Sequence, residues 1–455
     1  MKKIIALVLV LSVIFTLCAC SAKTEPETKA PAEAAAESSA PAETKQEAPA
    51  EKTKIKVMIW GTIDGRDELE KQWLAANPEF EAKYEVEYVL GGANSAECMD
   101  KIRLALASGE NICDVVVLNY IQVPELARAG VLKDLSDYYA PYEANICEAG
   151  KQLSQYDGTY VAVPSEIKTR IWYYRQDIFE ECGIDATQVK NTDDFIAAGL
   201  KIQETYPDAK MFNLGRQAQP YDFLLTMSGN GACYFDEDGN YNLSTNEGII
   251  SCLEDYKKMI DAGIVSEASD WTADWENELA DGTIVSVPSA AWMGNDTFLP
   301  TYSAENKGKW ACTTWPAFGG ATSGSDAGGQ IWAIPSFSSC PEEAAEYITW
   351  KWLSEDGGKV YFDVYKTITG ICNVNVLNSD AVMNTPNDFF GMSQTEAQIA
   401  AADQFSIFKY SPNASAEQAI AMEYFIKAIY GDMSIEEALK AAEKDMTDQI
   451  GNAFN

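Results

Sequence analysis

Histidine is absent from this sequence of 455 residues, and basic residues are few: 34 lysines and arginines stand against 69 aspartates and glutamates. Without an imidazole, the chain cannot form Ser-His-Asp or Cys-His nucleophilic pairs, histidine general bases or the usual ligand sets of catalytic zinc. The net charge of −35, without any basic stripe, excludes nucleic acid as a partner, because binding to phosphates needs lysine and arginine.

Motifs for nucleotides and for paired cysteines are also missing. The phosphate-binding pattern G-x-x-x-x-G-K-[ST] does not occur, so we expect no nucleotide cofactor. No C-x-x-C pair occurs among the cysteines that follow Cys20, which excludes zinc knuckles and thioredoxin motifs. Their odd number predicts mostly buried free thiols, with one or more disulfides as the alternative. These cysteines are Cys98, Cys113, Cys147, Cys182, Cys233, Cys252, Cys312, Cys340 and Cys372.

The first 19 residues have the pattern of a secretory signal peptide, with Lys2 and Lys3 before an apolar run that ends at Leu17. This run is shorter than the roughly 20 apolar residues of a membrane-spanning helix. Leu17-Cys18-Ala19-Cys20 resembles the bacterial lipobox, whose last cysteine receives lipid on its sulfur. We therefore expect a lipid anchor on Cys20. A permanent transmembrane helix and an ordinary signal-peptidase site are the alternatives.

The segment 20–53 has the composition of a disordered linker. After Cys20 it contains only Ala, Glu, Lys, Pro, Ser, Thr and one Gln, so it has no large apolar side chain with which to form a core. As a coil, it would span on the order of 30 Å. We expect it to hold the folded part near the outer face of the cytoplasmic membrane.

The roughly 400 residues after the linker are too many for one hydrophobic core, so the sequence predicts two lobes. Strand patterns at 54–60, 84–90 and 114–118 alternate with helical patterns. Strands that alternate with helices form a parallel sheet, and ligands bind beyond the carboxyl ends of such strands. Trp60 to Arg66 and Asn119 to Gln122 follow those ends.

Five blocks of the sequence resemble, in order, successive blocks of the extracellular solute-binding proteins, family 1, the maltodextrin-binding-like receptors of ABC importers for sugars. They are IKVMIWGTIDG, NICDVVVLNYIQVPELARAGVLKDLSDYY, DGTYVAVPSEIKTRIWYYRQDIFEECGID, DGTIVSVPSAAWMGN and GGQIWAIPSFSSCPEEAAEYITWKWLSEDG. The resemblance covers nearly the whole chain from Lys54 onward. It implies an α/β fold with two Rossmann-like lobes joined by a hinge, of the periplasmic-binding-protein type II, and a ligand held in the cleft between the lobes.

The same resemblance implies where the chain crosses between the lobes: near Val163-Pro164-Ser165, near Trp315-Pro316-Ala317 and near Thr369-Gly370. The predicted organisation is a signal peptide at 1–19, a lipid anchor and linker at 20–53, an N-terminal lobe of 54–164 and 317–370, and a C-terminal lobe of 165–316 and 371–455.

A sugar site needs aromatic rings under the apolar faces of the sugar and polar side chains at its edges. Trp292 corresponds to the cleft tryptophan of the family, although Ser-Ala-Ala-Trp here lacks the glycine of the family's G-x-W pattern. Trp60 ends the first strand, and Trp332 follows paired glycines. For all three tryptophans, a place in the core is the alternative.

Polar candidates come from the loops after the strands. Asp64 matches an acidic position of the family's first loop, with a helix cap or turn as the alternative. Asn119 and Gln122 lie in the loop after the third strand, again with a local structural role as the alternative. At the first crossing, Glu166 and Arg170 have a spacing that would put them on one face of a strand, together with Lys168 between them.

Gln219-Pro220-Tyr221 resembles the Glu-Pro-Tyr cleft turn of the family, with Tyr221 as a further stacking residue. Because Gln219 replaces the family's glutamate, the usual preference of the family for glucans does not carry over.

The sequence thus predicts a monomeric, lipid-anchored, non-enzymatic receptor that captures a carbohydrate, an oligosaccharide by preference, and delivers it to the permease of an ABC importer. Two alternatives remain. The same receptor fold could carry a polyamine, a peptide or a phosphorylated polyol, or the chain could be a secreted glycoside-active enzyme, since a cleft with carboxylates and aromatic rings also suits glycosidases.

Overall fold

The computed structural model describes residues 51–167, 169–218, 220–294, 299–321, 325–326, 329–402 and 405–454, without the side chains of 220, 221, 325 and 326. Residues 51–455 form a unit of their own. The predicted signal peptide, Cys20 and the linker up to residue 50 lie outside the described residues. No helix in the described part of the chain combines the length and the apolar content that a membrane crossing requires.

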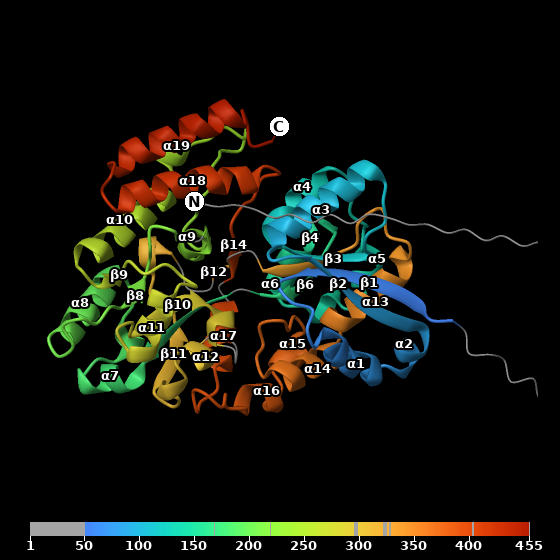
Figure 1. Ribbon diagram of the computed structural model, residues 1–455, viewed down its shortest axis with the longest axis horizontal. Helices are drawn as coiled ribbons and strands as arrows, with labels where there is room; N and C mark the ends of the chain where they lie inside the picture. The colour runs from blue at the N-terminus through green and yellow to red at the C-terminus, as the bar shows by residue number, and fades with distance from the viewer. Residues whose placement is uncertain are drawn as a thin grey trace, which may run out of the picture. The chain divides into compact units, whose positions relative to one another are not determined.

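The first sheet has five strands in the order β2-β1-β3-β13-β6 (Figure 1). They are β1 (Thr53–Trp60), β2 (Tyr84–Gly92), β3 (Val115–Asn119), β6 (Val163–Glu166) and β13 (Gln330–Ala333). As the alternation of strands and helices predicts, β1 pairs in parallel with β2 and β3. The sheet is nevertheless mixed, because β13 runs antiparallel to both β3 and β6. A strand that arrives from a distant part of the chain can pair in either direction.

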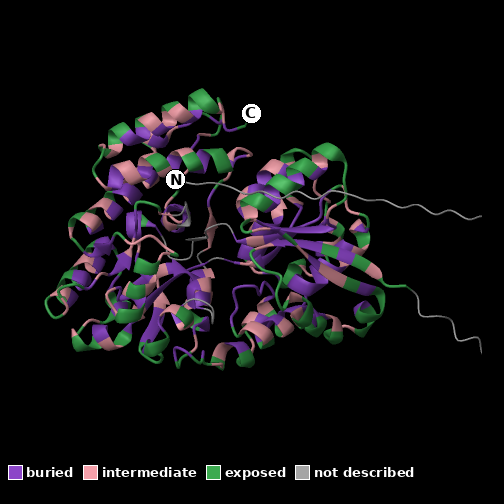
Figure 2. Cartoon of the chain, in the orientation of Figure 1, coloured by how far each residue is buried: buried purple, intermediate pink, exposed green. Residues whose placement is uncertain are grey.

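Helices cover both faces of this sheet. Figure 1 shows α3 (Ser95–Ser108) and α4 (Val123–Arg128) over one face, and α1 (Arg66–Ala76), α13 (Pro341–Leu353) and α14 (Glu355–Tyr365) over the other. The strands between them are buried, as β3 shows at its first four positions (Figure 2). Further helices of this core are α2 (Pro78–Lys83), α5 (Ser136–Tyr139), α6 (Glu148–Ser154), α15 (Val374–Leu377) and α16 (Asp380–Asn384).

A second sheet has three strands in the order β10-β7-β11, with both pairs antiparallel. These strands are β7 (Arg170–Arg175), β10 (Ser286–Ala290) and β11 (Trp310–Thr314). On β7, Trp172 belongs to one hydrophobic cluster, whereas Ile171 and Tyr173 belong to another. Successive side chains of a strand point to opposite faces, so the second sheet carries a core on each face.

The remaining elements pack around these two cores. The cluster that contains Trp172 includes α7 (Gln176–Glu181), α8 (Thr192–Gln203), α9 (Pro220–Met227), α10 (Glu247–Asp261), α18 (Ala414–Ile429) and α19 (Ile435–Gln449). The cluster that contains Tyr173 includes α11 (Ala273–Asp281), α12 (Leu299–Tyr302) and α17 (Thr395–Ala402). Two-residue strands form three further pairs: β4 (Gln155–Tyr156) with β5 (Thr159–Tyr160), β8 (Phe212–Asn213) with β9 (Val265–Ser266), and β12 (Ser325–Asp326) with β14 (Ser406–Ile407).

The segment that joins the first sheet to the second runs beside the segment that follows α14. Between the end of β6 and the start of β7, the Ile167 N–H donates to the carbonyl of Thr369. Gly370 lies so close to this segment that a Cβ on it would be 2.6 Å from the carbonyl oxygen of Ser165. A larger residue at 370 would therefore push the two segments apart.

The lobe boundaries stay a prediction. Phe318, which the predicted division assigns to the N-terminal lobe, packs in the cluster around Trp172. Ile371 and Cys372, assigned to the C-terminal lobe, pack in the core of the first sheet together with Val382. By their packing, the chain leaves the second core after residue 317 and leaves the first core after residue 370, so both changes of lobe lie closer to the C-terminus than predicted.

Candidate ligand-binding site

A cavity of about 290 Å³ lies at the edge of the first sheet where β1 and β6 end and the antiparallel β13 begins. This is the edge at which the sequence predicts ligand binding. Its polar lining comes from Arg66, Ser165, Glu166 and Gln330. Its aromatic lining consists of Trp60, Tyr88, Trp332, Trp352, Tyr361 and Tyr365. Aromatic faces together with a few polar groups are the composition that a sugar ring requires.

The aromatic wall of this cavity is held by contacts between its rings. Trp352 lies edge-on to Trp332, with ring centroids 5.3 Å apart, and to Tyr361 at 5.9 Å. The hydroxyl of Tyr361 is 3.0 Å from the Thr369 Oγ1. The indole N–H groups of Trp60 and Trp352 are buried and have no hydrogen-bond partner among the described residues. Because solvent does not reach these two nitrogens, a ligand in the cavity does not reach them in this structure either.

A buried ion pair lies behind the wall. Lys351 and Glu70 are paired with only 2% and 3% of their side chains exposed. The Lys351 ammonium lies 4.8 Å from the ring centroid of Trp332 and 4.3 Å from that of Trp73. Burial lowers the pKa of Lys351, and the charge of Glu70 opposes this shift. The charged pair supports the tryptophan wall from behind, and removal of either charge would strongly lower the stability of the fold.

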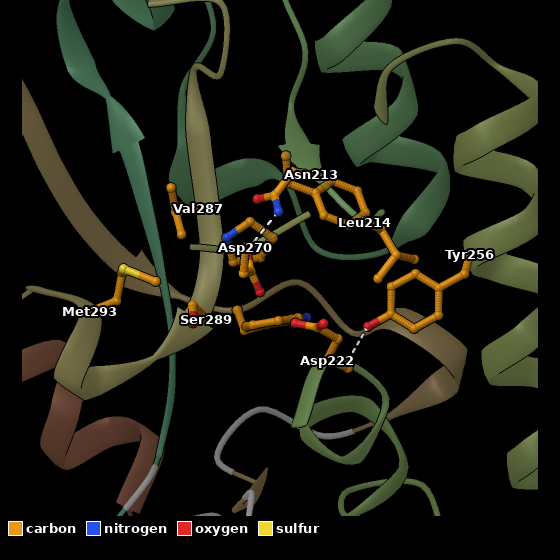
Figure 3. A pocket seen from close by; sticks show the side chains of 11 residues that line it. Asn213, Leu214, Asp222, Tyr256, Asp270, Val287, Ser289 and Met293 are labelled. Carbon is orange, nitrogen blue, oxygen red and sulfur yellow. Dashed lines mark hydrogen bonds between the residues drawn. The ribbon is translucent and has the colours of Figure 1, made fainter. Parts of the chain in front are cut away.

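A second hollow, of about 20 Å³, lies beside the second sheet and has the room of one water molecule. Figure 3 shows the carboxylates of Asp222 and Asp270 pointing toward the same space, next to Ser289. Asp270 accepts a hydrogen bond of 2.6 Å from the Asn213 amide, which orients its carboxylate. Trp315 also lines this hollow. Its walls thus combine hydrogen-bond acceptors with an aromatic ring.

Two tryptophans stack beside this hollow. Trp271, directly after Asp270, has its ring centroid 5.9 Å from that of Trp292, and their planes meet at 29°. Trp292 packs against both clusters of the second sheet, whereas Trp271 keeps 41% of its surface exposed. The φ angle of Trp271 is 65°, a strained value for a large residue. Trp271 also lies edge-on to the buried Trp275, with ring centroids 5.0 Å apart, so its ring is held by two other tryptophans.

Arg170 lies in the second core, away from Glu166. Their spacing predicts that the two residues share one face of a strand. They lie instead on different strands, because β6 ends at Glu166 and β7 begins at Arg170. The Arg170 guanidinium is fully buried and donates to the Leu225 carbonyl at 2.8 Å. Its Nε and Nη2 have no partner among the described residues, and burial lowers its pKa to about 9. Its guanidinium carbon lies 5.4 Å from the ring of Trp315.

The other predicted residues have different surroundings. Asp64 is exposed in the loop after β1 and is not among the residues that line the two hollows. The Asn119 backbone N–H donates to the side chain of Gln122 at 3.0 Å, and both side chains bond to Ser95. Asn119 and Gln122 therefore fix the loop after β3. Lys168, Gln219 and Cys20 lie outside the described residues, as does the side chain of Tyr221.

The structure thus gathers Trp60, Glu166 and Trp332 around one cavity and places Trp292 beside the other. The sequence reasoning did not single out several residues that line or flank the hollows, namely Tyr361, Tyr365, Asp222, Asp270 and Trp271. A signal existed for two of them: Asp270 and Trp271 form an Asp-Trp pair in a loop, which is an unusual place for tryptophan.

Comparison with known proteins gives the family and the fold. The model of a family described as "Bacterial extracellular solute-binding protein" matches residues 75–390. The arabinooligosaccharide-binding protein of Halalkalibacterium halodurans is 25% identical over 370 residues, which cover 76% of this chain and 78% of that protein. The lactose-binding protein of Rhizobium radiobacter is 23% identical over 385 residues, which cover 78% and 84%.

Two solved structures share the architecture. The ABC transporter associated binding protein from B. animalis subsp. lactis Bl-04, in complex with beta-1,6-galactobiose, has a TM-score of 0.70 at 21% identity and covers 89% of this chain and 100% of that one. The galacto-N-biose-/lacto-N-biose I-binding protein from Bifidobacterium longum has a TM-score of 0.71 at 20% identity, with 89% and 99% covered. The predicted periplasmic-binding-protein type II fold is therefore confirmed. The chain belongs to the family of bacterial extracellular solute-binding proteins.

Proposed function

We propose that the protein is a lipid-anchored receptor that captures an oligosaccharide and delivers it to the permease of an ABC importer. The observation that carries this proposal is the cavity at the edge of the first sheet, whose wall of Trp60, Trp332 and Trp352 lies next to the polar groups of Glu166 and Gln330. The names of the relatives supply the class of ligand, since they include an arabinooligosaccharide-binding and a lactose-binding protein.

The two hollows divide the work of binding. In the first, tryptophan faces stack on the C–H face of a sugar, and Glu166 and Gln330 form hydrogen bonds with its hydroxyls. The second has the room of one water molecule, so a single sugar hydroxyl would take the place of that water beside Asp222 and Asp270, while Trp271 with Trp292 offers a further stacking surface outside the hollow. Two separate stacking surfaces favour a ligand of more than one ring.

Capture requires the two hollows to close on one ligand. We infer that the lobes rotate about the segments that run side by side at Ile167 and Thr369, in the manner of hinge-bending binding proteins. The ligand then contributes to stability in proportion to its affinity for the closed form. The receptor acts as a monomer and presents its closed form to the permease.

The N-terminal part sets the location. A lipid on Cys20 and the linker of 20–53 would hold the receptor at the outer face of the cytoplasmic membrane, in agreement with a family of extracellular proteins. Diacylation of one cysteine supplies the two chains that stable anchoring takes.

A polyamine is the second candidate ligand, because Asp222, Asp270 and Trp315 line one small hollow in which a single ammonium group of such a ligand would take the place of a water molecule. Carboxylates and aromatic rings together also bind organic cations. The two candidates differ in charge, so they respond differently to salt: binding of a neutral sugar is insensitive to ionic strength, whereas binding of a polyamine weakens as salt screens the carboxylates.

The test is a thermal-shift screen of the mature chain with arabino-oligosaccharides, lactose, galactobiose and spermidine. We expect a rise in melting temperature with at least one oligosaccharide and no release of new reducing ends on prolonged incubation. A rise in melting temperature with spermidine alone would show that the ligand is an organic cation and not a sugar. Turnover of an oligosaccharide would identify an enzyme and contradict the receptor.

A further inference from the structure

Cys147 and Cys372 stand opposite each other across a short antiparallel contact. Ile146 and Asn373 form an antiparallel bridge, so the next pair in register is Cys147 with Cys372. The Cys147 N–H donates to the Cys372 carbonyl at 2.9 Å. Directly opposed residues of such a pair have Cα atoms about 4.5–5.5 Å apart, which is within the range of about 4.4–6.8 Å that a disulfide requires.

Both cysteines are free thiols, and the Cys372 Sγ–H donates to the Pro164 carbonyl at 3.9 Å. Interaction between the two side chains lowers the pKa of Cys147 and raises that of Cys372. The site is built closely around the second sulfur, since a Cβ added to Gly150 would lie 3.1 Å from the Cβ and 3.3 Å from the Sγ of Cys372. Glycine at 150 thus leaves the space that the Cys372 side chain occupies.

The pair is reachable from one side. Cys147 is half-buried and lines a cavity of about 200 Å³, which Ile167, Thr369 and Ile371 also line. Cys372 is fully buried behind it. An oxidant can therefore reach Cys147 first, and Cys372 then acts as the resolving thiol. Isolated buried thiols behave differently: burial raises the pKa of Cys312 to about 12, which keeps that thiol protonated and inert.

We propose that Cys147 and Cys372 are a disulfide site that closes when the protein is exposed to an oxidising exterior. The bond joins the start of α6 to the segment between α14 and α15, which are separated by more than two hundred residues of sequence. Closing so long a loop restricts the unfolded chain strongly and so stabilises the folded one. Because neither cysteine lines the two ligand hollows, the bond acts on stability and leaves the ligand contacts in place.

The reaction needs an oxidant, which is a low-molecular-weight disulfide outside the cell. The Cys147 thiolate attacks one sulfur of that disulfide, forms a mixed disulfide and releases one thiolate. The Cys372 thiolate then attacks the Cys147 sulfur and releases the second thiolate. Two protein thiols are oxidised, the small disulfide is reduced to two thiols, and the protons of the cysteines pass to the released thiolates.

The test uses the mature chain, incubated with oxidised glutathione, alkylated under denaturing conditions and digested for mass spectrometry. We expect one peptide pair joined through Cys147 and Cys372, two fewer thiols per chain and a melting temperature several degrees above that of the reduced protein. Cys147→Ser should show neither the joined peptides nor the gain in melting temperature, whereas the matched control Cys312→Ser should keep both.

Two results would overturn the inference. One is a glutathione adduct that persists on Cys147 without resolution by Cys372. The other is a joined peptide pair from different cysteines. The joined peptides are measured in the wild-type protein, so the conclusion does not depend on whether a variant folds.

Discussion

Trp271 and Trp292 stack with their ring centroids 5.9 Å apart, and the outer member of the pair, Trp271, is 41% exposed at a φ of 65°. The inner ring is held by the hydrophobic clusters on both faces of the second sheet. A stacked pair whose outer ring is partly exposed and directly follows Asp270 in the chain is a rigid surface on which a sugar ring can lie.

Trp271→Ala tests the outer face of this pair. We expect affinity for the oligosaccharide to fall about ten- to a hundredfold, because an aromatic contact of this kind contributes about 1–3 kcal/mol. The melting temperature without ligand should fall only slightly, since Trp271 is 41% exposed and alanine keeps the positive φ of this position. Calorimetric titration and a thermal melt measure both. Leu104→Ala, which removes an exposed side chain on α3, is the matched control and should change neither.

Lys351→Met tests the buried ion pair behind the first cavity. Removal of the ammonium leaves the Glu70 carboxylate buried with the hydroxyls of Tyr88 and Tyr347 but without a cation, which costs about 3–5 kcal/mol of the free energy of unfolding. Equilibrium unfolding in urea measures the loss. Lys440→Met, which breaks an exposed ion pair with Glu436 on α19, should leave the unfolding free energy almost unchanged. Equal effects of the two substitutions would show that the buried pair has no special role.

The buried carboxyl of Glu417 should make the stability of the folded protein depend on pH. Burial raises the pKa of this carboxyl above 4.5, while hydrogen bonds from Ser411 and Tyr241 oppose the shift. The folded protein therefore holds the proton more tightly than the unfolded chain, and the stability contributed by this group is present below pH 4.5 and lost as pH rises through the folded pKa.

Melting temperatures of the wild type and of Glu417→Gln, measured from pH 4.5 to neutrality, check this expectation. The amide cannot titrate but keeps an acceptor for the two donors. The wild type should therefore lose stability relative to the variant as pH rises. A difference that stays constant over this range would mean that Glu417 has an ordinary pKa.

Cys20→Ser tests the predicted anchor. Loss of the sulfur removes the site of lipid attachment, so the protein should leave the membrane fraction of fractionated cells, whereas its affinity for the ligand should stay the same because the linker separates the anchor from the folded part. Cys182→Ser serves as a control that keeps Cys20. A Cys20→Ser protein that stays in the membrane fraction would contradict the lipobox assignment.

The local pattern of the sequence predicts the first part of the fold well. β1, β2 and β3 follow directly from alternating strand and helix patterns, and they pair in parallel as expected. The direction of β13 does not follow, because its partners on β3 precede it by more than two hundred residues and a long connection allows either direction.

In the candidate site too, features set by neighbouring residues could be predicted, whereas features set by distant parts of the chain could not. Trp60 and Glu166 could be expected at the cavity because they end strands of one sheet. The different environments of Glu166 and Arg170 could not be predicted, since strand spacing holds only within one strand and the chain changes sheets between them. Likewise, the exposure of Trp271 depends on a backbone turn that residue type does not predict.

The most direct test of the receptor is a calorimetric titration of the oligosaccharide that gives the largest thermal shift, with the wild type and with Trp292→Ala, alongside melting temperatures without ligand. The account predicts saturable binding to the wild type and affinity about ten- to a hundredfold or more lower in the variant, because loss of the inner ring removes the support of the stacking surface. The variant should also melt at a lower temperature, since Trp292 is partly built into the core. Normal affinity in a folded Trp292→Ala protein would contradict the account.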